Sequence, residues 1–107
     1  MQKSYKSPFR QFVKKAHRPL RLAIEDEVDR VCENLGIGES KKGNLAGILV
    51  HKFKFNRREY LIAYRPPAHD PVPTGIASWF EFLVIDFYKV GTHENFYDEL
   101  KRYLREG

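Results

Sequence analysis

Residues 45–65, LAGILVHKFKFNRREYLIAYR, contain two runs of strand-forming residues separated by a short polar segment. In the first run, 45–55, apolar residues alternate with Lys52 and Lys54, so the two lysines should share one face of a strand. The second run, 59–65, is rich in tyrosine and aliphatic residues, and the three polar residues before it suffice to join antiparallel neighbours. This stretch therefore predicts a β-hairpin.

Two amphipathic helices are expected before the hairpin. The first has Ser7 placed as N-cap and Pro8 as first helical residue, and the second begins at Pro19 and should end at Gly36. Each has apolar residues at helical spacing, which predicts one buried face per helix. The apolar positions are Phe9, Phe12, Val13 and Ala16 in the first helix, and Leu20, Ile24, Val28, Val31, Cys32 and Leu35 in the second.

After the hairpin, the proline-rich segment 66–77 is expected to form a long irregular loop. The almost uniformly apolar segment 79–88 predicts a strand covered on both faces, and 90–92 predicts a turn. A final amphipathic helix is expected at 94–105, with Thr92 as its cap. The order of elements predicts one α+β domain, residues 1–107, with two N-terminal helices packed on a small, mainly antiparallel sheet and a C-terminal helix.

The composition favours a folded protein with an anionic partner. The 107 residues are 42% hydrophobic and 14% aromatic, and the formal net charge is +5. That charge suits RNA, DNA or an acidic protein, although a solvated basic surface would give the same number. Cys32 is the only cysteine, so no intramolecular disulfide can form, and the N-terminal segment resembles neither a signal peptide nor a membrane span. We therefore expect a cytoplasmic protein.

Few side chains suggest chemistry. Lys52 and Lys54 would form a positive patch that can bind phosphates, and His93, between the last strand and the last helix, is the best acid–base candidate. Tyr97, one turn further along, could orient a phosphate or stack on a base. Ordinary surface lysines, a capping histidine and a core tyrosine are the simpler interpretations. The histidines are too widely spaced for a metal site, and Cys32 should only fill the core.

Four segments together carry a family resemblance. They are GNLAG at 43–47, HKFKF at 51–55, EYLIAY at 59–64 and VGTHENFYDELK at 90–101. In this order and spacing they resemble the RelE/ParE superfamily of toxins from type II toxin–antitoxin systems, over about residues 9–104. The resemblance implies a RelE/ParE-like toxin domain and a small antitoxin partner whose acidic side chains meet the basic patch.

The resemblance also implies a function. Nuclease members of the superfamily cut mRNA on the ribosome without metal or cofactor, by attack of the 2′-hydroxyl on the adjacent phosphate. Carried over to this sequence, the catalytic positions are Lys52, Lys54, His93 and Tyr97. ParE-like members act instead on DNA gyrase.

One position departs from the nuclease pattern. Nuclease members commonly carry an arginine directly after the tyrosine of the second long strand, where this chain has Leu61. Arg65, on the same strand face, or Arg58, from the turn, could replace it in binding substrate, with Arg57 beside them. A gyrase poison and a non-catalytic module that binds the antitoxin therefore stay open beside an mRNA endonuclease.

Overall fold

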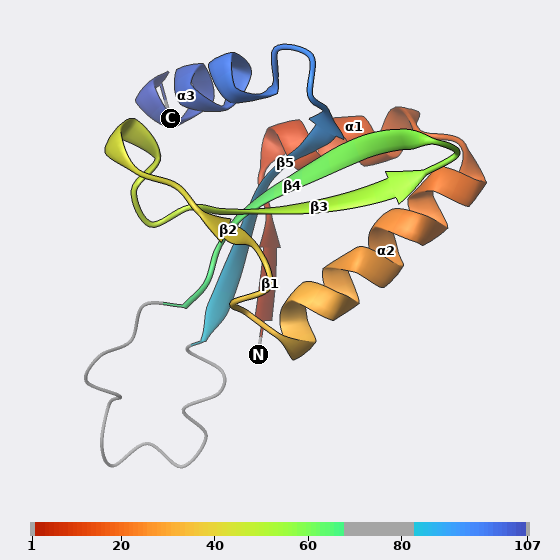
Figure 1. The fold of residues 1–107 in the computed structure, drawn as a ribbon, viewed down its shortest axis with the longest axis horizontal. Helices are drawn as coiled ribbons and strands as arrows, with labels where there is room; N and C mark the ends of the chain where they lie inside the picture. Colours follow the sequence, from red (N-terminus) through yellow and green to blue (C-terminus); the bar gives the residue numbers. More distant parts are fainter. Residues whose placement is uncertain (1, 68–82, 107) are drawn as a thin grey trace.

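The computed structural model describes residues 2–67 and 83–106. Its centre is a five-stranded sheet with strand order β1-β5-β4-β3-β2, in which only the pairing of β1 with β5 is parallel (Figure 1). In chain order the elements are β1 (Gln2–Tyr5), α1 (Ser7–Lys15), α2 (Arg18–Glu33), β2 (Glu39–Ser40), the 3-10 helix η1 (Gly43–Leu45), β3 (Leu49–Phe55), β4 (Arg58–Arg65), β5 (Val84–Thr92) and α3 (Phe96–Glu106). The expected α+β class, with two N-terminal helices and one C-terminal helix, is confirmed.

The hairpin forms as expected, with the whole of β3 paired to β4 from Arg58 to Tyr64. Its two-residue turn, Asn56 and Arg57, has φ angles of 50° and 67°, the left-handed backbone that suits the twist of a tight hairpin. Lys52 and Lys54 are exposed on one face of β3, as their alternation predicts. The start of the first strand at residue 45 was wrong, because η1 intervenes and β3 begins at Leu49.

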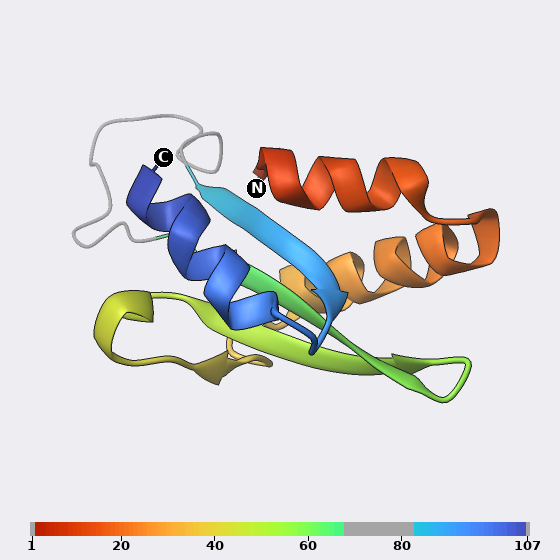
Figure 2. The same ribbon diagram turned by 90° about the horizontal axis from the view of Figure 1, so that it is seen from above.

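The two faces of the sheet are covered by different helices. Helices α1 and α2 pack on one face and α3 packs on the other (Figure 2). The first layer is centred on fully buried side chains such as Tyr64 and Phe87, and the second on Leu61, Phe96 and Leu100. Because both faces carry a hydrophobic layer, the inner strands β4 and β5 are apolar on both sides.

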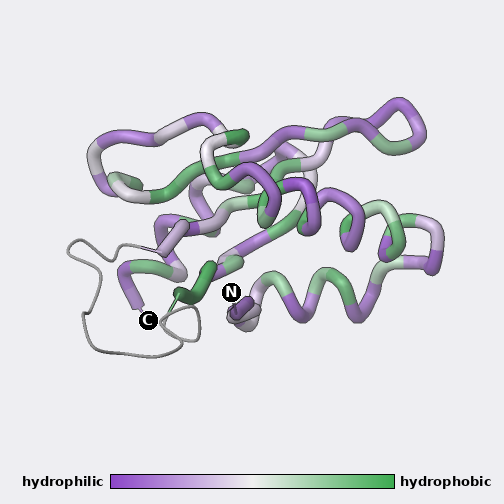
Figure 3. Tube along the Cα trace, turned by 90° about the horizontal axis from the view of Figure 1, so that it is seen from below, coloured by the Kyte–Doolittle hydropathy of each residue, from purple (hydrophilic) through white to green (hydrophobic). Residues whose placement is uncertain are grey.

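The helices bury the predicted stripes, and Figure 3 shows apolar and polar residues alternating along them. Their expected ends were wrong. Lys6, not Ser7, is the N-cap of α1, because β1 runs directly into the helix and the Lys6 N–H donates to the Phe87 carbonyl at 2.8 Å. Helix α2 ends at Glu33 with Asn34 as its C-cap, before the expected stop at Gly36.

The end of the last strand also differs from the prediction. The segment 90–92 continues β5 instead of turning, because Val90 and Thr92 pair with Ile62 and Tyr60 of β4. Thr92 is therefore not the cap of α3, which begins at Phe96 after the backbone turns through Asn95 at φ 59°. Residues 68–77 of the expected loop and 79–82 of the expected strand lie outside the described residues.

Strand β1 was not predicted. Gln2 to Tyr5 pair with Val84 to Phe87 in parallel register, so β1 forms an edge of the sheet beside β5. Its four residues lack the alternating apolar pattern of a half-buried strand, and pairing with β5 determines their conformation. None of the helices in the described part of the chain is long and apolar enough to cross a membrane.

Candidate functional site

A row of polar side chains crosses the α3 face of the sheet at the hairpin end of β4. Lys54 of β3 is the register partner of Glu59 of β4. His93 follows Thr92, the partner of Tyr60, and this places it beside Glu59 on the other side. The His93 Nε2 atom makes a short polar contact with the Glu59 Oε1 atom. Three neighbouring chain segments therefore bring a cation, a carboxylate and an imidazole together.

The electrostatics of this row favour an ionised Glu59. The hydrogen bond with His93 is the main cause that lowers the pKa of the Glu59 carboxyl below its ordinary value, and the charges of His93, Lys52 and Lys54 act in the same direction. The side chains of His93 and Glu59 are 50% and 37% exposed, so a substrate can reach both. Because His93 uses Nε2 to bind the carboxylate, its Nδ1 atom is left for a second partner.

A second row lies one step further along the same face. Lys52 pairs with Leu61, and Leu61 pairs with Gly91 of β5. Leu61 has no exposed surface and belongs to the layer beneath Phe96 and Leu100 of α3. The position where an arginine was expected in a nuclease is thus a core position covered by the C-terminal helix.

Tyr97 lies on α3 in a different contact. Its ring packs edge to face on Phe96, and the Lys41 Nζ atom lies 5.2 Å from the ring centroid. Partial burial alone would lower the pKa of Lys41, but hydrogen bonds with Glu39 and Tyr97 outweigh it and raise that pKa. Tyr97 therefore faces the segment before η1, while His93 faces β4.

The three arginines named as substrate-binding candidates do not join the His93 row. Arg57 forms the exposed tip of the hairpin, and Arg58 alternates with Glu59, so Arg58 falls on the opposite face of the sheet. Arg65 shares the face of Leu61 but lies four residues away, or about 13 Å along the strand. Neither Arg58 nor Arg65 occupies the place of the missing arginine.

Two residues of the site were missed in the sequence. Glu59 was assigned only to a strand, although a two-residue turn places it directly opposite Lys54 and on the same face. Lys41 gave no such signal, because its approach to Tyr97 depends on how η1 and α3 pack. In the described ranges, 2–67 and 83–106, no group of three or more potential metal ligands occurs.

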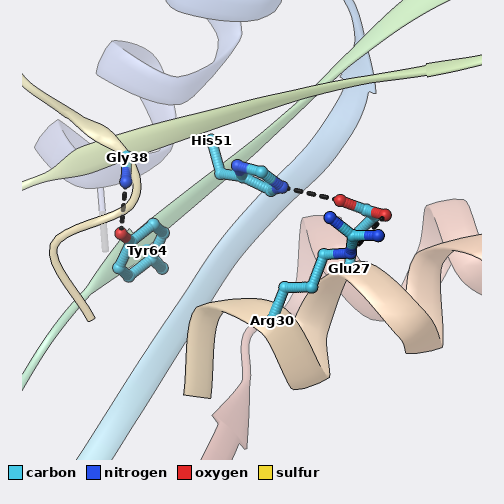
Figure 4. A network of polar contacts seen from close by, with 5 residues as sticks. All are labelled: Glu27, Arg30, Gly38, His51 and Tyr64. Carbon is cyan, nitrogen blue, oxygen red and sulfur yellow. Dashed lines mark hydrogen bonds and ion pairs between the residues drawn. The ribbon is translucent and has the colours of Figure 1, made fainter. Parts of the chain in front are cut away.

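A second histidine–glutamate pair lies on the other face of the sheet (Figure 4). The His51 Nε2 atom of β3 is 2.8 Å from the Glu27 Oε1 atom of α2, and Arg30 approaches the other oxygen of Glu27 at 3.4 Å. His51 is 8% exposed. Nearby, the Tyr64 hydroxyl donates to the Leu35 carbonyl at 2.7 Å and accepts from the Gly38 N–H at 3.0 Å. These contacts fasten α2 and the chain that follows it to the sheet.

The fold and the site define a small basic α+β protein whose sheet presents an exposed histidine–carboxylate pair beside two lysines. The family model for the ParE-like toxin of type II bacterial toxin–antitoxin systems matches residues 4–101, and the chain belongs to this family. The resemblance to RelE/ParE toxins is thereby confirmed. No significant match was found among curated proteins or among solved structures.

Proposed function

We propose that this type II toxin is a metal-free endoribonuclease that cuts mRNA on the ribosome. The observation that carries the proposal is the exposed contact of His93 with Glu59, beside Lys52 and Lys54. An imidazole oriented by a carboxylate is suited to proton transfer near neutral pH, and two ammonium groups can neutralise a phosphate. No other face of the described chain combines an exposed histidine–carboxylate contact with a lysine pair.

The proposed reaction starts with attack of the RNA 2′-hydroxyl on the adjacent phosphorus atom. Glu59 holds the Nε2 side of His93, and the Nδ1 atom takes the proton from the attacking hydroxyl. The ammonium groups of Lys52 and Lys54 stabilise the dianionic transition state, and one of them gives a proton to the leaving 5′-oxygen. The products are a 2′,3′-cyclic phosphate and a free 5′-hydroxyl. Tyr97, which faces Lys41 and not His93, would contact RNA away from the scissile phosphate.

Mapping of mRNA ends tests this proposal. After induction of the toxin, primer extension should show new 5′ ends within coding sequence, and these ends should disappear in His93→Ala and Lys52→Ala variants. Arg21→Ala is a matched control, because Arg21 is an exposed cation on α2, on the opposite side of the sheet. Growth arrest without any new RNA ends would overturn the proposal.

The second candidate function is poisoning of DNA gyrase. It is favoured by Leu61, whose complete burial beneath α3 leaves the nuclease arginine position without a charge. In this case the toxin should inhibit supercoiling by purified gyrase and induce the DNA damage response. A double variant, His93→Ala with Lys52→Ala, should then remain toxic.

Membership of the family implies a cognate antitoxin. We propose that an acidic segment of this antitoxin lies over the exposed face around Lys52 and Lys54 in the cytoplasm, since opposite charges would meet there. Expression of the neighbouring open reading frame should relieve growth arrest. Lys52→Glu with Lys54→Glu should weaken the purified complex, whereas a reversal at Arg21 should leave it unchanged.

A further inference from the structure

A polar hollow of about 470 Å³ lies on the α3 face of the sheet, at the end of β4 remote from His93. Its size falls within the range of sites that hold small molecules. Its lining combines two cations, one amide, two aromatic rings and one aliphatic side chain. These residues are Lys6, Arg65, Asn44, Tyr88, Tyr103 and Leu104.

Arg65 gives the hollow its anion-binding character. Its guanidinium carbon lies 5.6 Å from the centroid of the Tyr88 ring, so the group is held against an aromatic face. In the described part of the chain, Arg65 makes no ion pair within 4.0 Å. A partly buried guanidinium that has no carboxylate partner among residues 2–67 and 83–106 is suited to a bidentate phosphate contact.

Lys6 supplies the second cation. Lys6 directly follows strand β1, which pairs with β5. The Lys6 N–H donates to the Phe87 carbonyl of β5, and this bond holds Lys6 beside the hollow. The Lys6 Nζ atom is 3.5 Å from the Asp86 Oδ1 atom, and Asp86 is the register partner of Arg65. One carboxylate thus stands among two cations, which leaves a net positive charge. A phosphate in the hollow would bind Arg65 directly. It would also bind Lys6, which keeps its ion pair with Asp86.

The aromatic residues add a surface for a flat ring. Tyr88 and Tyr103 meet edge to face, with centroids 6.4 Å apart. Tyr88 is 8% exposed and supports Arg65, whereas Tyr103 is partly exposed and can stack on a base. Asn44 is exposed, and its amide can both donate to and accept from the edge of a base.

We infer that this hollow binds a nucleoside phosphate, with the phosphate on Arg65 and Lys6 and the base against Tyr103. The nucleotide can be free or part of an RNA chain, since both present the same chemistry. If the nucleotide is part of an RNA chain, the inference rests on the proposed endonuclease function. The hollow would then be a second RNA contact of the toxin, at the far end of α3. Arg65 would then bind RNA without replacing an arginine at Leu61.

Titration of the purified toxin with adenosine 5′-monophosphate tests the inference. Calorimetry should show saturable binding, and adenosine without its phosphate should bind at least about tenfold more weakly. Arg65→Gln should also weaken binding about tenfold or more, and Tyr103→Leu severalfold. Arg21→Gln, the matched control, should bind as the parent does. If Arg65→Gln does not fold, Lys6→Gln serves in its place, because the Lys6 side chain is 34% exposed. Binding that does not saturate, or that is equal in the pocket variants and the parent, would overturn the inference.

An uncleavable 2′-O-methyl oligonucleotide distinguishes the two sources. If the hollow belongs to an RNA path, the oligonucleotide should compete with the mononucleotide, and Arg65→Gln should raise KM for RNA cleavage with little change in kcat. If it serves a free nucleotide, the oligonucleotide should not compete. Absence of RNA cleavage by the parent toxin would remove the proposed function, while loss of mononucleotide binding in Arg65→Gln would still support this site.

Discussion

The sheet carries a histidine–glutamate pair on each face, and the two pairs differ mainly in exposure. On the face covered by α1 and α2, the side chains of His51 and Glu27 are 10% and 17% exposed. On the α3 face, those of His93 and Glu59 are 50% and 37% exposed. The buried pair joins a helix to a strand, whereas the exposed pair lies at strand ends beside Lys54. The same two residue types therefore stabilise the fold in one place and are open to a substrate in the other.

This difference teaches that residue type alone does not identify a catalytic pair. A buried hydrogen-bonded pair contributes to stability, and its removal leaves a partner without a hydrogen bond. An exposed pair contributes little to stability, because water solvates both groups in the unfolded and folded chain. Lys54 is the register partner of Glu59 and Lys52 shares its face of the sheet, so this pair lies where an anion could approach it.

Removal of His93 should give the largest effect. His93→Ala should lower the cleavage rate by about 10²- to 10⁴-fold, because the proposed base is lost, while the midpoint of thermal unfolding stays almost unchanged. His51→Ala should do the reverse, with lower stability and an unchanged cleavage rate per folded molecule. Single-turnover cleavage of RNA on ribosomes measures the first quantity. Equal rates for His93→Ala and the parent would contradict the assignment of the two pairs.

Leu61 stands where nuclease members carry an arginine, and restoring that arginine should destabilise the protein, because α3 covers this position. Leu61→Arg would place a charge in the apolar layer beneath Phe96 and Leu100 and should cost about 3 to 5 kcal/mol of unfolding free energy. Urea unfolding measures this loss. Leu61→Met, which keeps volume and polarity similar, should cost less than about 1.5 kcal/mol. A stable Leu61→Arg protein with faster cleavage would show that α3 can move away from this position.

Removal of each glutamate compares the two pairs directly. Glu27→Ala should lower the unfolding free energy by about 2 kcal/mol, because it leaves His51 buried without its partner. Glu59→Ala should leave the unfolding free energy almost unchanged and should instead lower kcat, since His93 loses its orientation. Chemical denaturation and cleavage assays on both variants test the comparison. A similar loss of stability in both would show that exposure does not separate them.

The pH dependence of stability should show the smallest effect. Because contact with His93 lowers the pKa of Glu59 in the folded chain, Glu59 stabilises the fold at pH above the ordinary glutamate pKa. This contribution is lost as pH falls through the lowered folded value. Thermal unfolding between about pH 6 and pH 2 should therefore show a slightly steeper loss in the parent than in Glu59→Gln. Identical curves would mean that the contact does not persist in solution.

Local patterns predicted much of this architecture. The hairpin, the two N-terminal helices and the shared face of Lys52 and Lys54 follow from periodicity, because side chains repeat every two residues in strands and every 3.6 in helices. Helix and strand ends were less accurate. At Ser7 and Thr92 backbone pairing with distant segments decided them, and α2 ends before the expected stop at Gly36. Such pairing leaves little trace in a short stretch of sequence.

The sequence by itself determined the two N-terminal helices, the hairpin and the final helix, their apolar faces and the family, and it identified Lys52, Lys54 and His93 as candidates. Only the tertiary structure decided that Glu59 contacts His93, that α3 covers Leu61, and that β1 brings Lys6 to Arg65. The physical reason is that each of these neighbours comes from a different strand or helix. Their proximity depends on sheet order and register, which long-range backbone hydrogen bonds and packing of the two layers determine together.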